Sequence, residues 1–90
     1  MEYTDITFLR RHCRTEEDED DYLTQLADSA ESLLGDMGIT PDASILPAYR
    51  LAVAALVLHW HDNPGGTGII PESLDRLVTS LKQRMIKGVI

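Results

Sequence analysis

The sequence has one cysteine, few basic residues and no long apolar stretch. Because Cys13 has no partner for an internal disulfide, a secreted scaffold stapled by disulfides is excluded. Eight basic residues stand against fifteen acidic ones, which gives a net charge of −7 with histidine neutral. A free-standing nucleic-acid-binding protein normally carries a basic excess, so the composition disfavours that class.

The longest apolar run, residues 51–58, is far shorter than the roughly 20 residues that span a bilayer. No basic segment followed by an apolar one opens the chain, so we expect neither a secretion signal nor a membrane anchor. Ninety residues, 43% of them apolar, suffice for one domain with a small core. The sequence therefore predicts a small, soluble, acidic protein of intracellular origin, with residues 1–90 forming a single domain.

The charge is unevenly distributed along the chain. Residues 1–63 hold thirteen acids and four bases, whereas residues 64–90 hold two acids and four bases. The acids concentrate in one run, made of Glu16, Glu17, Asp18, Glu19, Asp20 and Asp21. Carboxylates favour the positive end of a helix dipole, so the run is typical of a solvated helix start. It can also form an electronegative face towards a partner or a DNA passage, but it lacks the spacing and central glycine of a calcium loop.

Apolar residues recur at steps of three and four over residues 16–37, which predicts a helix with one apolar stripe. Thr15 and Asp18 resemble a capping box at its start, and Gly35 and Gly38 bracket its end. The stripe consists of Leu23, Leu26, Ala27, Ala30, Leu33, Leu34 and Met37.

A second helix is predicted from Leu46 and Pro47 to Trp60, because proline suits the first helical turn. Its residues 51–58 are apolar all round, so we expect it at the centre of the fold. The alternative for so apolar a run is a buried strand, but its alanines favour a helix. We expect this helix to carry more apolar surface than one small chain can cover, with other copies sharing the excess.

Two further helices complete a predicted all-α bundle of about four. A short one lies between Thr4 and Cys13, where Thr4 or Asp5 can cap it. The last helix begins near Pro71 and Gly88 can close it, leaving Val89 and Ile90 as the apolar end of a C-terminal tail at about residues 86–90. Its apolar face is formed by Leu74, Leu77, Val78, Leu81 and Met85. Its polar face is formed by Asp75, Arg76, Ser80, Lys82 and Gln83.

The strongest candidate for chemistry is the cluster at residues 59–62, His-Trp-His-Asp. Its histidines are two residues apart, which points them roughly 200° away from each other on a helix, so they cannot chelate a metal together. A metal set made of His12, Cys13, His59 and Asp62 is therefore disfavoured. Trp60 could stack on a base, but a lone tryptophan on an apolar helix is more typical of a core residue.

Two other patterns suggest chemistry and are disfavoured. Cys13 next to His12 is no thiol–base pair, because adjacent side chains on a helix diverge. Cys13 is in phase with Leu9, which favours a small core residue. The glycine-rich loop 63–68 lacks the Lys-Ser/Thr ending of a phosphate loop. We therefore predict no enzymatic activity, no cofactor and no metal.

Three stretches together resemble the small head–tail connector proteins of tailed phages, also called adaptor or head-completion proteins. The first is Leu-Arg-Arg-His-Cys-Arg-Thr at 9–15, followed by the acids and by the helical pattern of 22–30. The second is Leu-Pro at 46–47, with an apolar helix that ends in His-Trp-His-Asp-Asn at 59–63. The third is Ile-Pro-x-x-Leu-x-x-Leu at 70–77.

The resemblance covers about residues 4–82 in the family's order and extends to prophage and gene-transfer-agent versions. Three positions depart from the family pattern. Cys13 stands where an aliphatic residue is common, His61 replaces the usual tyrosine, and Pro64 stands where arginine is frequent.

The resemblance implies a structural role in the virion, after synthesis in the host cytoplasm. Such proteins form a ring, typically of twelve copies, between the portal and a tail-proximal stopper or terminator protein. DNA passes through the ring without specific binding, and no cofactor takes part. We expect the acidic run 16–21 to face this channel or a partner. Portal docking is expected of the basic, apolar C-terminal end, made of Lys82, Arg84, Met85, Ile86, Lys87, Val89 and Ile90.

The alternative is an acidic helical interaction module that inhibits a host protein by imitating DNA. That function requires carboxylates spread along one long face at phosphate-like spacing. The bunching of the acids in a single six-residue run disfavours it.

Overall fold

The computed structural model describes the backbone of residues 3–89 and the side chains of residues 3–84. Four α-helices make up the described chain: α1 (Ile6–Cys13), α2 (Asp20–Asp36), α3 (Leu46–Asp62) and α4 (Glu72–Val89). Two short 3₁₀ turns, η1 (Glu17–Glu19) and η2 (Pro64–Gly66), precede α2 and follow α3. The predicted all-α bundle is confirmed, and no strand occurs within residues 3–89.

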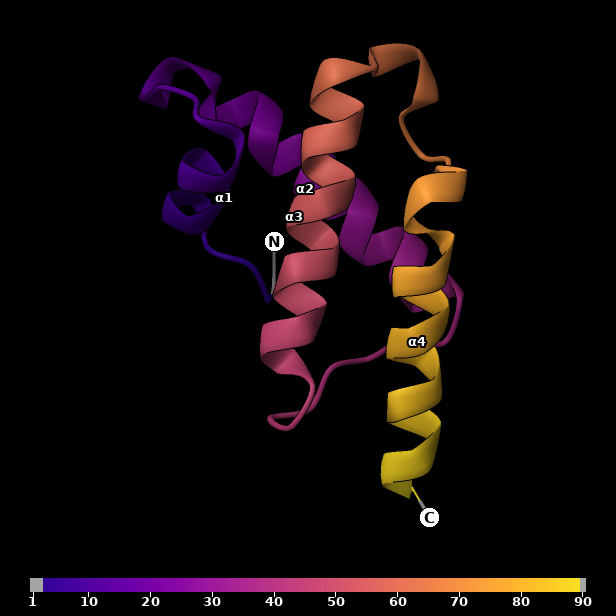
Figure 1. The fold of residues 1–90 in the computed structure, drawn as a ribbon. Helices are drawn as coiled ribbons and strands as arrows, with labels where there is room; N and C mark the ends of the chain where they lie inside the picture. The colour runs from indigo at the N-terminus through magenta and orange to yellow at the C-terminus, as the bar shows by residue number, and fades with distance from the viewer. Residues whose placement is uncertain (1–2, 90) are drawn as a thin grey trace.

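Helix α3 lies at the centre between α1 and α4, and α2 crosses behind it (Figure 1). The core is built mainly from α2 and α3. Seven side chains of α3 are buried, namely Tyr49, Ala52, Val53, Ala54, Leu56, Val57 and Trp60. Its central position is therefore confirmed.

The prediction that α3 carries more apolar surface than the chain can cover is wrong for most of that helix. Ala55 and Leu58 are half-buried, and Leu51, 53% exposed, is the one strongly exposed apolar side chain that α3 shows. The helix is covered because three other helices of the same chain pack around it. Other copies are not needed to bury its apolar run.

The end of α2 forms a Schellman motif, as its glycines suggested. Gly38 takes a left-handed φ of 83°, and its amide donates to the carbonyl of Gly35. The amide of Ile39 donates to the carbonyl of Leu34 at 2.9 Å, and both of these side chains are buried. This turn ends the helix one residue before the predicted Met37 and folds the chain back towards α3.

The predicted capping box of Thr15 and Asp18 is wrong. Arg14 adopts a left-handed conformation with φ 56°, and the Thr15 amide donates to the carbonyl of Arg10. Thr15 therefore belongs to the end of α1, and its buried hydroxyl has no hydrogen-bond partner among the described residues. Helix α2 begins only at Asp20, after the turn η1. The cap predicted for α1 is confirmed, since Asp5 accepts a hydrogen bond from the Thr7 amide.

Helix α4 is amphipathic and packs mainly on α3. Val78 and Leu81 are buried, and the predicted polar face is exposed throughout. Leu77, expected on the buried face, is 40% exposed. The prediction that Gly88 ends this helix is wrong, because α4 continues to Val89 and extends past the N-terminal end of α3 (Figure 1). The backbone of residues 86–89, predicted to belong to a tail, is therefore helical. Ile90 lies outside the described residues.

Candidate functional site

The acidic run 16–21, hereafter the acidic segment, is attached to the rest of the fold by an arginine. Arg10 of α1 makes a two-pronged ion pair with Asp20, its Nε donating to Oδ1 at 2.9 Å and its Nη2 donating to Oδ2 at 2.8 Å. The hydrogen bonds from Arg10 lower the pKa of Asp20, and the same contact raises the pKa of Arg10. The pair joins α1 to the first turn of α2.

A histidine holds the other side of the acidic segment. The Nε2 atom of His61, in the last turn of α3, lies 2.9 Å from the Oε1 atom of Glu19. Its Nδ1 atom lies 3.6 Å from the Oδ1 atom of Asp62, and the Tyr22 ring lies beside the imidazole at a centroid distance of 5.9 Å. The hydrogen bond to Glu19 is the main cause of a raised pKa of His61, and Asp62 contributes in the same direction.

The six acids therefore fall into two groups. Glu19 and Asp20 are half-buried and engaged with His61 and Arg10. The other four acids are exposed, namely Glu16, Glu17, Asp18 and Asp21. The arrangement leaves an electronegative surface that is attached at two points, by Arg10 and by His61.

At the far end of the fold, α4 presents the two basic residues of the expected docking set that are described. Lys82 and Arg84 are both exposed, on the part of α4 that follows its last described core contact at Leu81. The side chains of the remaining expected docking residues, Met85, Ile86, Lys87, Val89 and Ile90, lie outside the described residues. The acidic segment and the basic end thus belong to opposite ends of the structure (Figure 1).

The disfavoured metal set is only partly brought together. His12, His59 and Asp62 line a hollow of about 290 Å³ with residues of α3 and α4. In the part of the chain with described side chains, no three or more of the histidine, cysteine, aspartate and glutamate residues are arranged to hold a metal ion.

Cys13 packs against the core, as its phase with Leu9 predicted. Burial raises the pKa of its thiol, and the nearby carboxylates of Asp62 and Glu19 raise it further. A thiol with a raised pKa is a poor nucleophile near neutral pH, because the thiolate is the reactive form.

Trp60 is also a core residue. Its indole N–H donates to the carbonyl of Ile69 at 2.9 Å, and this hydrogen bond attaches the connection 63–71 to α3.

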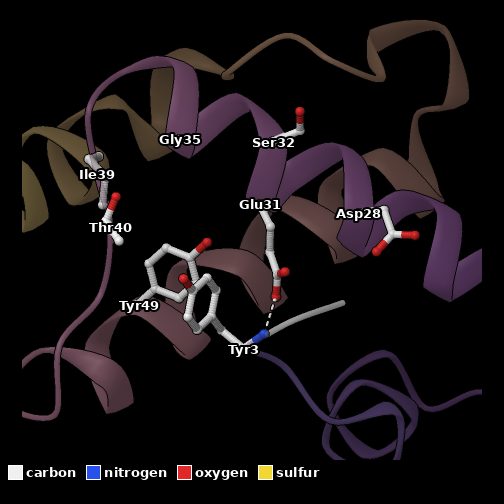
Figure 2. A pocket seen from close by; sticks show the side chains of 8 residues that line it. All are labelled: Tyr3, Asp28, Glu31, Ser32, Gly35, Ile39, Thr40 and Tyr49. Atoms are coloured by element: carbon white, nitrogen blue, oxygen red, sulfur yellow. Dashed lines mark hydrogen bonds between the residues drawn. The ribbon is translucent and has the colours of Figure 1, made fainter.

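A second hollow, of about 400 Å³, lies where the N-terminal segment meets α2 and α3 (Figure 2). The Tyr3 and Tyr49 rings meet edge to face with centroids 5.4 Å apart. Figure 2 shows Glu31 reaching from α2 to the Tyr3 backbone, whose amide donates to it at 3.1 Å. The Thr4 hydroxyl donates to the same carboxylate, and the Arg50 side chain donates to the Tyr3 carbonyl at 2.7 Å. These contacts hold the N-terminal segment in place.

Sequence reasoning missed these tertiary contacts. The pairing of Arg10 with Asp20 and of His61 with Glu19 joins elements that no periodicity relates to one another. The only available signal was charge. The first helix carries basic residues and the end of α3 carries histidines, and either group could pair with the six acids of the acidic segment. The contacts of Glu31 and Arg50 with Tyr3 left no recognisable signal in the sequence.

The residues with described structure include no helix that is both long enough and apolar enough to cross a membrane. Comparison with known proteins found no matching family model, no matching curated protein and no matching solved structure.

Proposed function

We propose that this chain is a non-enzymatic structural protein of the head–tail junction of a tailed phage or a related particle. In that role it forms a ring below the portal, extends the DNA channel and offers a platform to a tail-proximal stopper or terminator protein. The proposal rests on the ordered motifs at 9–15, 46–63 and 70–77.

One structural observation supports treating these motifs as a unit. Arg10 of the first motif binds Asp20, and His61 of the second binds the neighbouring Glu19. The indole of Trp60, also in the second motif, donates to the carbonyl of Ile69, which directly precedes the third. Stretches far apart in the sequence therefore meet in the fold, although one of the contacts uses His61, a position that departs from the family pattern.

The distribution of charge is compatible with this role. Exposed acids on the acidic segment would let a DNA phosphate backbone slide past without being retained, because like charges repel. A closed ring requires a head-to-tail contact between two different surfaces of the same chain. Apolar side chains that the subunit leaves exposed are available for such a contact. Within residues 3–84 the large ones are Tyr22, Leu51, Ile69 and Leu77.

The acidic segment provides weaker support for the alternative, a DNA-imitating inhibitor. Such a protein needs free carboxylates along an extended face. Here Glu19 and Asp20 are occupied by His61 and Arg10, which leaves four exposed acids in this run.

The test is deletion of the gene from the genome that encodes it, followed by electron microscopy of the particles. We expect DNA-filled heads without tails that leak DNA, and restoration of tailed particles when the wild-type chain is supplied in trans. Tailed, infectious particles from the deletion strain, with no trace of the polypeptide in wild-type virions by mass spectrometry, would contradict the proposal.

A charge-reversal pair tests the docking end. The double variant Lys82→Glu, Arg84→Glu changes exposed side chains, so we expect normal folding but loss of portal capture in a pull-down. Arg76→Glu, an exposed substitution earlier on the same helix, is the matched control and should still capture the portal. Recovery of a host DNA-binding protein instead of a portal would favour the alternative.

A further inference from the structure

His61 lies between two carboxylates that belong to different elements. Its Nε2 atom faces Glu19 of η1 at 2.9 Å, and its Nδ1 atom faces Asp62 of its own helix at 3.6 Å. An imidazolium donates from both nitrogens, whereas a neutral imidazole has one N–H and one lone pair. After loss of the proton, one of the two carboxylates therefore faces a lone pair instead of a donor.

The other ionisable groups around this histidine do not replace its proton. Tyr22 of α2 contributes its ring face, and the Cys13 thiol of α1 lies close enough for its pKa to be raised by both Glu19 and Asp62. Arg10, the permanent cation bound to the neighbouring Asp20, is committed to that carboxylate by two hydrogen bonds. Glu19 therefore depends on His61 for a positive partner.

We propose that His61 is a proton-operated clamp that fixes the acidic segment against the C-terminal end of α3. With the imidazolium present, Glu19 is held and η1 is docked beside α3. With the neutral ring, the segment keeps its anchor at Asp20, since arginine stays charged. The anchor at Glu19 is weakened, because the ion pair is replaced at most by a neutral hydrogen bond from the one remaining N–H. The exposed acids 16–18, on the far side of Glu19 from the anchor at Asp20, are then held less tightly.

This inference goes beyond the proposed function and does not depend on it. It identifies the acidic segment as an element with two states, chosen by the protonation of one side chain near neutral pH. A partner or DNA passage that meets this surface would meet a fixed array of carboxylates at low pH and a looser one at high pH.

The test is amide hydrogen exchange of residues 17–21 across the titration of His61, which is followed by NMR in the same samples. Exchange rates are normalised to those of an unstructured peptide at each pH. In the wild-type chain we expect protection to fall about two- to fivefold as His61 loses its proton, the range that a partly exposed ion pair supports.

Two variants reproduce the two protonation states of His61 independently of pH. His61→Gln removes the charge, so residues 17–21 should show the lower protection at every pH. His61→Lys keeps a cation, so the higher protection should persist above the pH at which wild-type His61 titrates. His12→Gln is the matched control and should reproduce the wild-type profile.

Glu19→Gln provides an independent check, because it leaves His61 in place and removes its main acidic partner. We expect a lower pKa of His61 by NMR and pH-independent protection of residues 17–21. Equal protection of this segment in wild type and His61→Gln at a pH where the wild-type ring is protonated would overturn the proposal. An unchanged pKa of His61 in Glu19→Gln would overturn it as well.

Discussion

Helices α3 and α4 lie side by side, but α3 is apolar over most of its length and α4 is amphipathic (Figure 1). Helix α3 packs against three other helices and buries seven side chains. Helix α4 packs mainly on α3, and its described part buries only Val78 and Leu81. The more apolar helix has three helical neighbours and buries most of its surface, whereas the amphipathic helix has one main neighbour and buries one stripe.

This difference divides the molecule into a rigid part and an exposed part. The rigid part consists of α1, α2 and α3, joined by a shared core and by the Arg10–Asp20 and His61–Glu19 contacts. The exposed part is the end of α4, where Lys82, Gln83 and Arg84 all face solvent. Surfaces of the second kind are suited to a partner, because binding there does not require the core to open.

The largest expected effect contrasts Trp60 with Leu77. Trp60 is fully buried and its indole holds the connection to α4, so Trp60→Ala should lower the free energy of unfolding by about 3–5 kcal/mol. Leu77 on α4 is 40% exposed, and Leu77→Ala should cost about 1 kcal/mol or less. Urea titration followed by circular dichroism measures both changes. Equal losses for the two variants would show that α4 is as deeply embedded as α3.

Hydrogen exchange compares the two helices without mutation. Amides near the middle of α3, at residues 52–57, should open only when the whole domain unfolds. Amides at 82–84 of α4 should exchange through local opening, because the side chains there are exposed. We expect protection at least about 100-fold greater in α3, measured by NMR at constant pH. Similar protection in both segments would contradict the division into a rigid and an exposed part.

Most of the fold follows from local patterns. The apolar steps of α2, the Pro47 start of α3 and the glycine-terminated end of α2 are short-range features, and all three are present in the structure. The failures came from tertiary context. The apolar run 51–58 does not reveal how many helices will cover it. Thr15 has a side chain suited to an N-cap, but the left-handed conformation of Arg14 places Thr15 at the C-terminal end of α1.

The candidate site was less predictable than the fold, because its contacts depend on which charged groups meet in space. The sequence drew attention to the acidic run and to His61, but in separate arguments. Their contact at 2.9 Å spans 42 positions in the chain and requires α3 to return alongside η1. Spacing rules cover one helix turn or one strand pair, so they cannot predict such a pairing.

Removal of the cap on α1 should have a smaller effect, because it acts on one end of one short helix of the rigid part. Asp5 accepts a hydrogen bond from the Thr7 amide, so Asp5→Ala should destabilise the protein by about 1 kcal/mol. Asp5→Asn is the matched control and should retain nearly full stability, since asparagine is an equally good cap. Urea midpoints measure the difference. A larger loss for Asp5→Asn than for Asp5→Ala would mean that charge, rather than capping, is what matters at this position.

The smallest effect concerns the pH dependence of the contact between α3 and the acidic segment. The pKa of His61 is raised in the folded chain above its usual value of 6.5, so folding favours the protonated ring. This contribution to stability is complete below about pH 6.5, the value in the unfolded chain, and is lost as the pH rises through the folded-state pKa. The expected loss between pH 6 and pH 8 is about 0.5 kcal/mol, since Glu19 is partly exposed and solvent screens the pair. His61→Gln should abolish this slope. Salt at 1 M should reduce the slope, because it screens the attraction between the protonated ring and the Glu19 carboxylate. Urea titrations at a series of pH values measure the slope. A wild-type protein that gains stability between pH 6 and pH 8, or a slope that persists unchanged in His61→Gln, would show that the acidic segment is held by contacts other than this ion pair.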